Sequence, residues 1–228
     1  MKLEDILEES SIKGIIFDLD GTLTHTLNEH VEAFYQVFTR NGFNVDRKKI
    51  ENEMGRRPTD ITRDLIFNGV PDSKLNEDAT KQLYRMAEEK VKTFNSLIPE
   101  NPPLMPGLPG IIIRAKELGM KIAVCSSTPL ENVKVILERI HLLEYFDQLV
   151  TAEDVIIGKP HPEAFLKAVE KLALPFDAVI VIGDSIHDVA SAKEGGLKII
   201  AIATGKHSTN DLKESGADFV FKNLSMML

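Results

Sequence analysis

The chain has 228 residues, a formal net charge of −8 and a pI near 5.3. This acidic balance argues against nucleic acid or an anionic membrane surface as a partner, because both require clustered lysine and arginine. The single cysteine, Cys125, excludes an internal disulfide and any metal site built from several cysteines.

The N-terminal segment, residues 1–11, holds several acidic residues and no long apolar run. We therefore expect no secretory signal there, and no later segment is apolar for long enough to span a bilayer. These features predict a cytoplasmic protein.

The first predicted strand covers residues 14–19 and carries two acids at its end. In an extended chain Asp18 and Asp20 point to the same side, whereas Leu19 turns toward the core. Acids just past a buried strand lie where open α/β sheets bind their ligands. The pair therefore predicts a site with chemical activity.

A long helical insertion, from Leu23 to Met105, separates this strand from the next. It is too long for a strand crossover and too regular for a loop. Apolar residues recur at helical spacing in three groups: Val31, Phe34, Tyr35 and Phe38; Ile61, Leu65 and Ile66; and Leu83, Met86, Ala87, Lys90 and Phe94, with the lysine stem at the edge of its face. The prolines and glycines from Pro99 to Gly110 are expected to form the return linker. We predict a helical lid beside the two aspartates.

The rest of the chain alternates short apolar runs with amphipathic stretches. The predicted strands are residues 121–125, 149–151, 178–183, 198–203 and 218–221. This alternation indicates βαβ units. We predict an α/β protein with a Rossmann-like parallel sheet core, formed by residues 1–22 and 104–228, and an inserted all-helical cap domain, residues 23–103.

Reactive side chains follow four of the predicted strands. They are Asp18 and Asp20, Ser126 and Ser127, Lys159, and Asp184 and Asp188. In a parallel sheet these strand ends lie along one edge, so the four clusters can converge on one pocket.

These four clusters, in this order and with an inserted helical segment, resemble the haloacid dehalogenase superfamily, and the chain is similar to its β-phosphoglucomutase and phosphoglycolate phosphatase branch. The resemblance covers nearly the whole chain. It implies that Asp18 attacks phosphorus and holds it as an aspartyl-phosphate. It also implies that Asp18, the main-chain carbonyl of Asp20, and Asp184 bind a metal ion.

Chemical reasoning agrees with these roles. Asp20 is placed to protonate the leaving alkoxide and then to activate water. Several carboxylates around a phosphate require a cation, and an all-oxygen site with few protein ligands suits Mg²⁺. Asp188, one helical turn beyond Asp184, is expected to support the metal site or to contact the ion through water.

The phosphoryl oxygens need donors that are positioned before the reaction begins. The Ser126 hydroxyl, the backbone amide of Ser127 and the Lys159 ammonium can supply them, although both serines can equally cap a helix. His30 lies near the position of a histidine that assists the general acid in related mutases, but it also fits a surface helix. Arg56 and Arg57 can reach a second anionic group on the substrate, or they form an ordinary basic turn.

The expected function is hydrolysis of a small phosphorylated metabolite by a Mg²⁺-dependent phosphatase. A sugar-phosphate mutase uses the same acids and remains an alternative. More distant alternatives are a phosphorylation-switch receiver, against which the cap insertion and Asp20 count, and a binder of phosphorylated ligands without activity. A dehalogenase is disfavoured by Asp20 and Asp184, and a phosphonate-cleaving enzyme would need a Schiff-base lysine in the cap, which the sequence does not identify.

Overall fold

The computed structural model describes residues 2–9 and 11–228. Within them, six strands form one parallel sheet in the order β3-β2-β1-β4-β5-β6. The strands are β1 (Gly14–Phe17), β2 (Lys121–Cys125), β3 (Gln148–Val150), β4 (Val179–Gly183), β5 (Lys198–Ile202) and β6 (Phe219–Phe221). The first strand lies at the centre, between β2 and β4, so the acids that follow it lie at the middle of the sheet edge.

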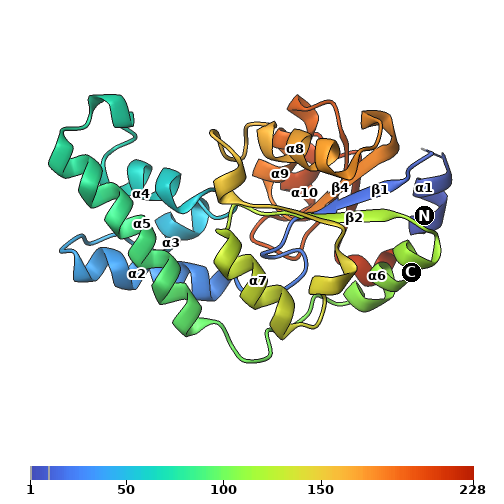
Figure 1. Ribbon diagram of the computed structural model, residues 1–228, viewed down its shortest axis with the longest axis horizontal. Coiled ribbons are helices and arrows are strands. Elements are labelled where there is room, and N and C mark those ends of the chain that lie inside the picture. The colour runs from blue at the N-terminus through green and yellow to red at the C-terminus, as the bar shows by residue number, and fades with distance from the viewer. Residues whose placement is uncertain (1, 10) are drawn as a thin grey trace.

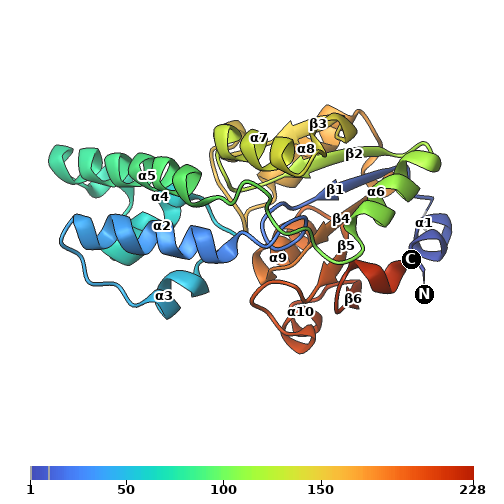
Figure 2. The ribbon, with the colours of Figure 1, turned by 90° about the horizontal axis from the view of Figure 1, so that it is seen from below.

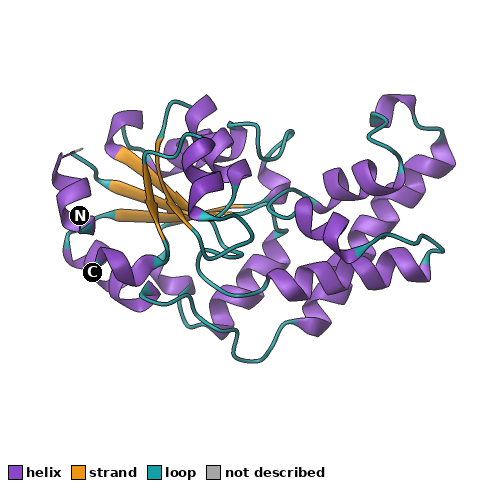
Figure 3. Ribbon diagram, turned by 180° about the vertical axis from the view of Figure 1, so that it is seen from behind, coloured by secondary structure: helices purple, strands orange, loops and turns teal. Residues whose placement is uncertain are grey.

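Helices cover both faces of this sheet (Figures 1 and 3). One face carries α1 (Leu3–Glu9), α6 (Leu108–Glu117) and α7 (Leu130–Arg139), and the other carries α8 (Glu163–Leu172), α9 (Ile186–Glu194) and α10 (Thr209–Glu214). The core also contains short 3-10 turns: η2 (Leu143–Tyr145), η3 (Ala152–Asp154) and η4 (Phe176–Ala178) lie between helices and strands, and η5 (Leu224–Met227) follows β6.

Alternation along the central strand explains why the core has two layers. Ile15 and Phe17 pack with the first group of helices, whereas Ile16 packs with the second. All three side chains are fully buried, as expected for a strand covered on both faces. The strand is therefore a continuous apolar run that ends abruptly in the polar Asp18.

The insertion forms a separate helical group at one end of the molecule, far from both termini (Figures 1 and 2). It contains α2 (Leu27–Arg40), α3 (Arg47–Asn52), α4 (Pro58–Ile66), η1 (Asp72–Lys74) and α5 (Glu77–Leu97). These helices enclose a third apolar cluster, centred on Phe34, Phe38 and Met86. Side chains cap two of the helices, since Asp46 accepts a hydrogen bond from the Lys48 amide and Asn76 accepts one from the Ala79 amide.

The predicted α/β fold with a parallel sheet and a helical insertion is confirmed, with two local corrections. Pro109 and Gly110 do not belong to the return linker, because α6 begins at Leu108 and includes both. Proline is tolerated in a first helical turn, where its missing N–H has no partner to lose. Lys90 does not lie at the edge of its helical face, because it is only 1% exposed and its ammonium lies inside the protein.

Among the described residues, no helix is long and apolar enough to cross a membrane.

Candidate active site

The four predicted clusters meet at the carboxyl edge of the sheet. Asp18 follows β1, Ser126 follows β2 and Asp184 follows β4, while Lys159 lies in the segment that joins η3 to α8. All four side chains are buried. Residues that are up to 166 positions apart in the sequence (184 minus 18) therefore surround one small volume.

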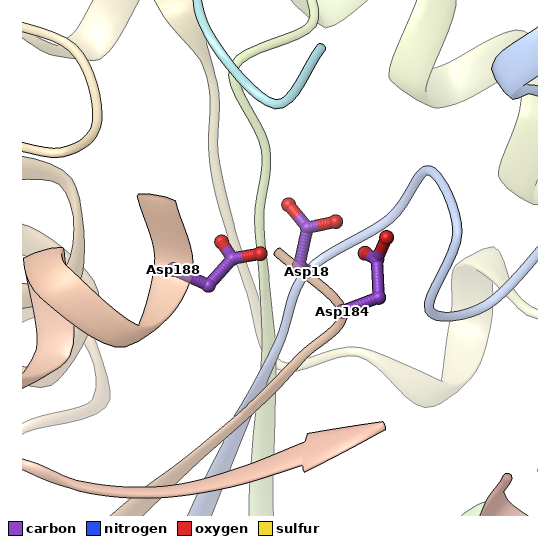
Figure 4. A group of neighbouring side chains, drawn as sticks. All are labelled: Asp18, Asp184 and Asp188. Carbon is purple, nitrogen blue, oxygen red and sulfur yellow. The ribbon is translucent and has the colours of Figure 1, made fainter. Parts of the chain in front are cut away.

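Three carboxylates form the centre of this volume. One oxygen each of Asp18, Asp184 and Asp188 lies within 4.8 Å of the others, and the three side chains point into a common space (Figure 4). The Lys159 ammonium contacts two of them, at 2.7 Å from Asp18 Oδ1 and 2.7 Å from Asp188 Oδ1, and also donates to the Cys125 carbonyl at 3.0 Å. Asp184 accepts a hydrogen bond from the neutral Thr22 hydroxyl at 3.0 Å.

This centre has more negative than positive charge. Burial raises the pKa of Asp18 to about 7 against the opposing effect of Lys159, and burial together with Asp18 and Asp188 raises the pKa of Asp184 well above its usual value. Burial opposes the charge of Lys159, but the two aspartates outweigh it and raise the pKa of the ammonium. Three buried carboxylates with one lysine are costly unless a further cation joins them. Oxygen ligands of this kind fit a hard divalent cation.

Two glycines make room for the Asp184 carboxylate. A Cβ atom on Gly21 or on Gly205 would overlap with it. Gly21 also has a φ of +93°, which favours glycine, and its carbonyl accepts a hydrogen bond from Thr204 at 2.6 Å. The glycine that follows the Asp18–Asp20 pair is therefore required by both backbone conformation and space.

Asp20 lies in a different environment from the carboxylate cluster. Its carboxylate accepts hydrogen bonds from Thr26 at 2.5 Å and from Thr128 at 2.8 Å, and it lies 3.0 Å from His30 Nε2. Burial raises the pKa of Asp20, but the histidine and the two hydroxyls outweigh burial and hold the pKa below its usual range. The pKa of Asp18 is thus raised and the pKa of Asp20 lowered, although the two aspartates are only two residues apart. Such opposite shifts are typical of a pair with separate catalytic tasks.

Lys90 is a residue that the sequence pattern failed to place in the site. Its Nζ lies 2.5 Å from His30 Nδ1, so that Lys90, His30 and Asp20 form a continuous polar chain from the cap to the core. The ammonium lies over the rings of Phe34 and Phe94, and burial lowers its pKa to about 7. The signal in the sequence was a lysine within an apolar helical face. The same pattern arises when a lysine packs its stem at the edge of a core and keeps its ammonium in water, so the pattern alone does not place Lys90 in the site.

The two predicted phosphate-binding serines have other partners in this arrangement. Ser126 accepts a hydrogen bond from the Thr128 amide at 3.0 Å, and the Ser127 hydroxyl donates to the Gly55 carbonyl of the cap at 2.8 Å. Both line the cavity that contains Asp18 and Asp20. Their role toward phosphate remains a prediction.

The two predicted cap arginines differ in position. Arg56 lines the cavity and forms ion pairs with Glu53 at 2.5 Å and Asp64 at 2.7 Å. Arg57 lies outside this cavity, where it binds Asp60 with two N–H groups and donates to the Val155 carbonyl.

The cap lies closed against the core. The cavity between them has a volume of about 30 Å³ and is lined by Asp18 and Asp20 below and by His30, Arg56 and Lys90 above. This space has room for only a few water molecules.

The fold and the site together define an α/β enzyme with a buried acidic centre beneath a helical cap. The family model described as haloacid dehalogenase-like hydrolase matches residues 15–202. The chain belongs to this family, and the expectation of an enzyme of the haloacid dehalogenase superfamily is confirmed.

Similar proteins agree over nearly the whole chain. The probable phosphatase IndB of Dickeya dadantii is 30% identical over 213 residues, covering 92% of this chain and 90% of that protein. A phosphorylated carbohydrates phosphatase of Thermotoga maritima is 30% identical over 210 residues, covering 90% of this chain and 92% of that protein. The crystal structure of a β-phosphoglucomutase from Clostridium difficile superposes with a TM-score of 0.83 at 25% identity, covering 95% of this chain and 93% of that one.

Proposed function

We propose that this enzyme is a Mg²⁺-dependent phosphatase that hydrolyses a small phosphorylated metabolite, such as a sugar phosphate or a phosphoglycolate-like compound, through an aspartyl-phosphate on Asp18. The observation that carries the proposal is the meeting of Asp18, Asp184 and Lys159 from separate loops in one buried centre, with Asp20 beside it. The names of the relatives, which include phosphatases, support the same class of reaction.

The first half of the reaction forms the phosphorylated enzyme. An oxygen of Asp18 forms a bond to phosphorus while the bond to the leaving oxygen breaks, and Asp20 supplies a proton to that oxygen. The Lys159 ammonium, 2.7 Å from Asp18, is positioned to bind the phosphoryl oxygens, where the Ser126 hydroxyl and the Ser127 amide would add hydrogen bonds.

The second half releases phosphate. Ionised Asp20 takes a proton from water, the water oxygen attacks phosphorus, and the bond to Asp18 breaks. In the closed arrangement His30 and two hydroxyls keep Asp20 ionised, which is the form that this step requires. For the first step Asp20 carries a proton, and its carboxyl group would turn from Thr26 and Thr128 toward the leaving oxygen.

The metal site would be formed by Asp18, Asp184 and the main-chain carbonyl of Asp20. When bound there, Mg²⁺ would neutralise the carboxylates and the phosphate oxygens that approach them. Asp188 has a supporting role, because Lys159 and Ser185 already donate to its two oxygens. Residues 23–103 would move as the cap, while residues 1–22 and 104–228 form the core.

The test is a screen of phosphorylated metabolites that measures release of inorganic phosphate with Mg²⁺ and with EDTA. Phosphate released only with the metal supports the proposal. A stable phospho-Asp18 without turnover would instead indicate a receiver, and binding without hydrolysis would indicate a ligand-binding protein.

A sugar-phosphate mutase is the second candidate. The observation that favours it is His30, whose Nε2 lies 3.0 Å from Asp20, because related mutases place a histidine near this position to assist the general acid. A mutase would convert an added sugar phosphate to its isomer faster than it releases phosphate, and product analysis separates the two reactions.

A further inference from the structure

One short segment of the cap, residues 55–57, touches three of the loops that carry the site. The Gly55 carbonyl accepts a hydrogen bond from Ser127, which follows β2. Gly55 also packs against Ser185, which follows β4, since a Cβ on Gly55 would lie 3.2 Å from the Ser185 hydroxyl. Arg57 donates to the Val155 carbonyl at 3.1 Å, in the segment that leads to Lys159. Three of the four loops that carry the site therefore meet this one segment when the cap is closed.

Arg57 is held in place for its contact. Its Nε and Nη2 donate to the two oxygens of Asp60, at 2.7 and 3.1 Å, which leaves Nη1 to reach the core. The Arg57 and Asp60 side chains are 16% and 11% exposed. Two parallel hydrogen bonds fix the plane of a guanidinium, so the direction of its third contact is also fixed.

The segment that Arg57 contacts, residues 155–158, is also held by Glu163. The amides of Ile156 and Ile157 donate to the Glu163 carboxylate at 3.0 and 2.9 Å. Two residues further on, the Lys159 ammonium binds Asp18. Arg57 and Glu163 thus hold residues 155–158 between them, directly before the lysine of the active site.

Gly158 shows how closely Arg57 approaches this segment. A Cβ on Gly158 would lie 2.8 Å from both Cγ and Nε of Arg57. The backbone of Gly158 is not in the left-handed region, so an alanine is compatible with its conformation. The absence of a side chain at this position therefore serves the contact with Arg57, because glycine allows another group to come close to the backbone.

The geometry points to Arg57 as a positioning residue that couples closure of the cap to the placement of Lys159, through its contact with Val155 and Gly158. This inference rests on the proposed function, since Lys159 would act on the transferred phosphoryl group. Arg57 does not line the cavity that contains Asp18, so it acts through the loop and not on the substrate.

Kinetics of four variants test the coupling. Gly158→Ala should lower kcat about tenfold or more with little change in KM, because small displacements of catalytic groups have effects of this size. Arg57→Ala should lower kcat about tenfold through loss of a charged hydrogen bond. The double variant Arg57→Ala/Gly158→Ala should have the same kcat as Arg57→Ala alone, because the added methyl group no longer overlaps with the Arg57 side chain.

Arg63→Ala is the matched control. Arg63 binds the same Asp60 at 2.7 Å, and its other partner is Asp72 in the cap. Its loss should leave kcat within about twofold of the wild type. A loss as large as that of Arg57→Ala would assign the effect to the stability of the cap and overturn the inference, as would additive losses in the double variant.

Amide hydrogen exchange tests the same contact without any substrate. Gly158→Ala and Arg57→Ala should each speed exchange in residues 124–129 and 153–160, whereas Arg63→Ala should not. Unchanged exchange in Gly158→Ala overturns the coupling. If the wild type hydrolyses no phosphate ester, the proposed function fails, and exchange still decides whether Arg57 couples the cap to the loop.

Discussion

Lys90→Met should change the way in which the free energy of unfolding depends on pH. Burial lowers the pKa of Lys90 from 10.5 to about 7 in the folded protein. The unfolded chain therefore binds a proton more readily than the folded protein between these two values, and stability rises with pH across that range. Methionine has a similar length and no charge, so the variant lacks this dependence.

The size of the effect follows from the two pKa values. Each pH unit between them changes the free energy of unfolding by about 1.4 kcal/mol, so burial of the ammonium costs about 5 kcal/mol well below pH 7 and almost nothing above pH 10.5. Between pH 7 and pH 9 the free energy of unfolding of the wild type should rise by about 2 kcal/mol relative to that of Lys90→Met. The rise is slightly smaller than two full pH units would give, because Lys90 is already half deprotonated at pH 7.

Urea unfolding at pH 7 and pH 9, followed by circular dichroism and by tyrosine fluorescence, measures this difference. Coincident transitions from the two probes establish two-state behaviour. Lys92→Met is the control, because the Lys92 side chain lies on the same helix and is 71% exposed. The reasoning is refuted if the difference between wild type and Lys90→Met is the same at both pH values.

Three further predictions concern the reaction. Asp18→Asn should abolish phosphate release and labelling by ³²P-substrate while the melting temperature stays close to that of the wild type, because the two side chains have similar volumes; substantial activity in this variant would contradict the role of Asp18 as nucleophile. Asp20→Asn should slow both formation and breakdown of the phosphoenzyme, by about 10²- to 10⁴-fold as is usual for a lost acid or base; rapid-quench kinetics measure both steps, and an unchanged rate for either would remove that role from Asp20. Treatment with EDTA should abolish activity and Mg²⁺ should restore it, whereas full turnover in EDTA would show that the acidic centre works without a metal.

The strands and the acid pair could be predicted because their signals are local. A run of buried strand residues such as 14–17 must be apolar on both faces, and the spacing of Asp18 and Asp20 places them on one side of an extended chain. The convergence of Lys159 and Asp184 with them followed from a rule about parallel sheets, because all strand ends point to one edge.

The partners of several predicted residues could not be derived in this way. The Ser127 hydroxyl bonds to the cap, and Arg57 bonds to Asp60 and Val155. These contacts depend on how the cap helices pack against the core loops. The sequence pattern within the cap or within the core does not contain that information.

The sequence by itself determined a parallel sheet, a helical insertion and a set of acids at one edge, because the apolar periodicity that predicts strands and helices depends on neighbouring residues. Only the tertiary structure decided that Lys90 is buried against His30 and that the Arg57 side chain packs on the backbone of Gly158. The physical reason is that burial and close approach result from packing between segments up to about a hundred residues apart. The local sequence pattern of a helix or loop is the same whether or not such a distant segment packs against it.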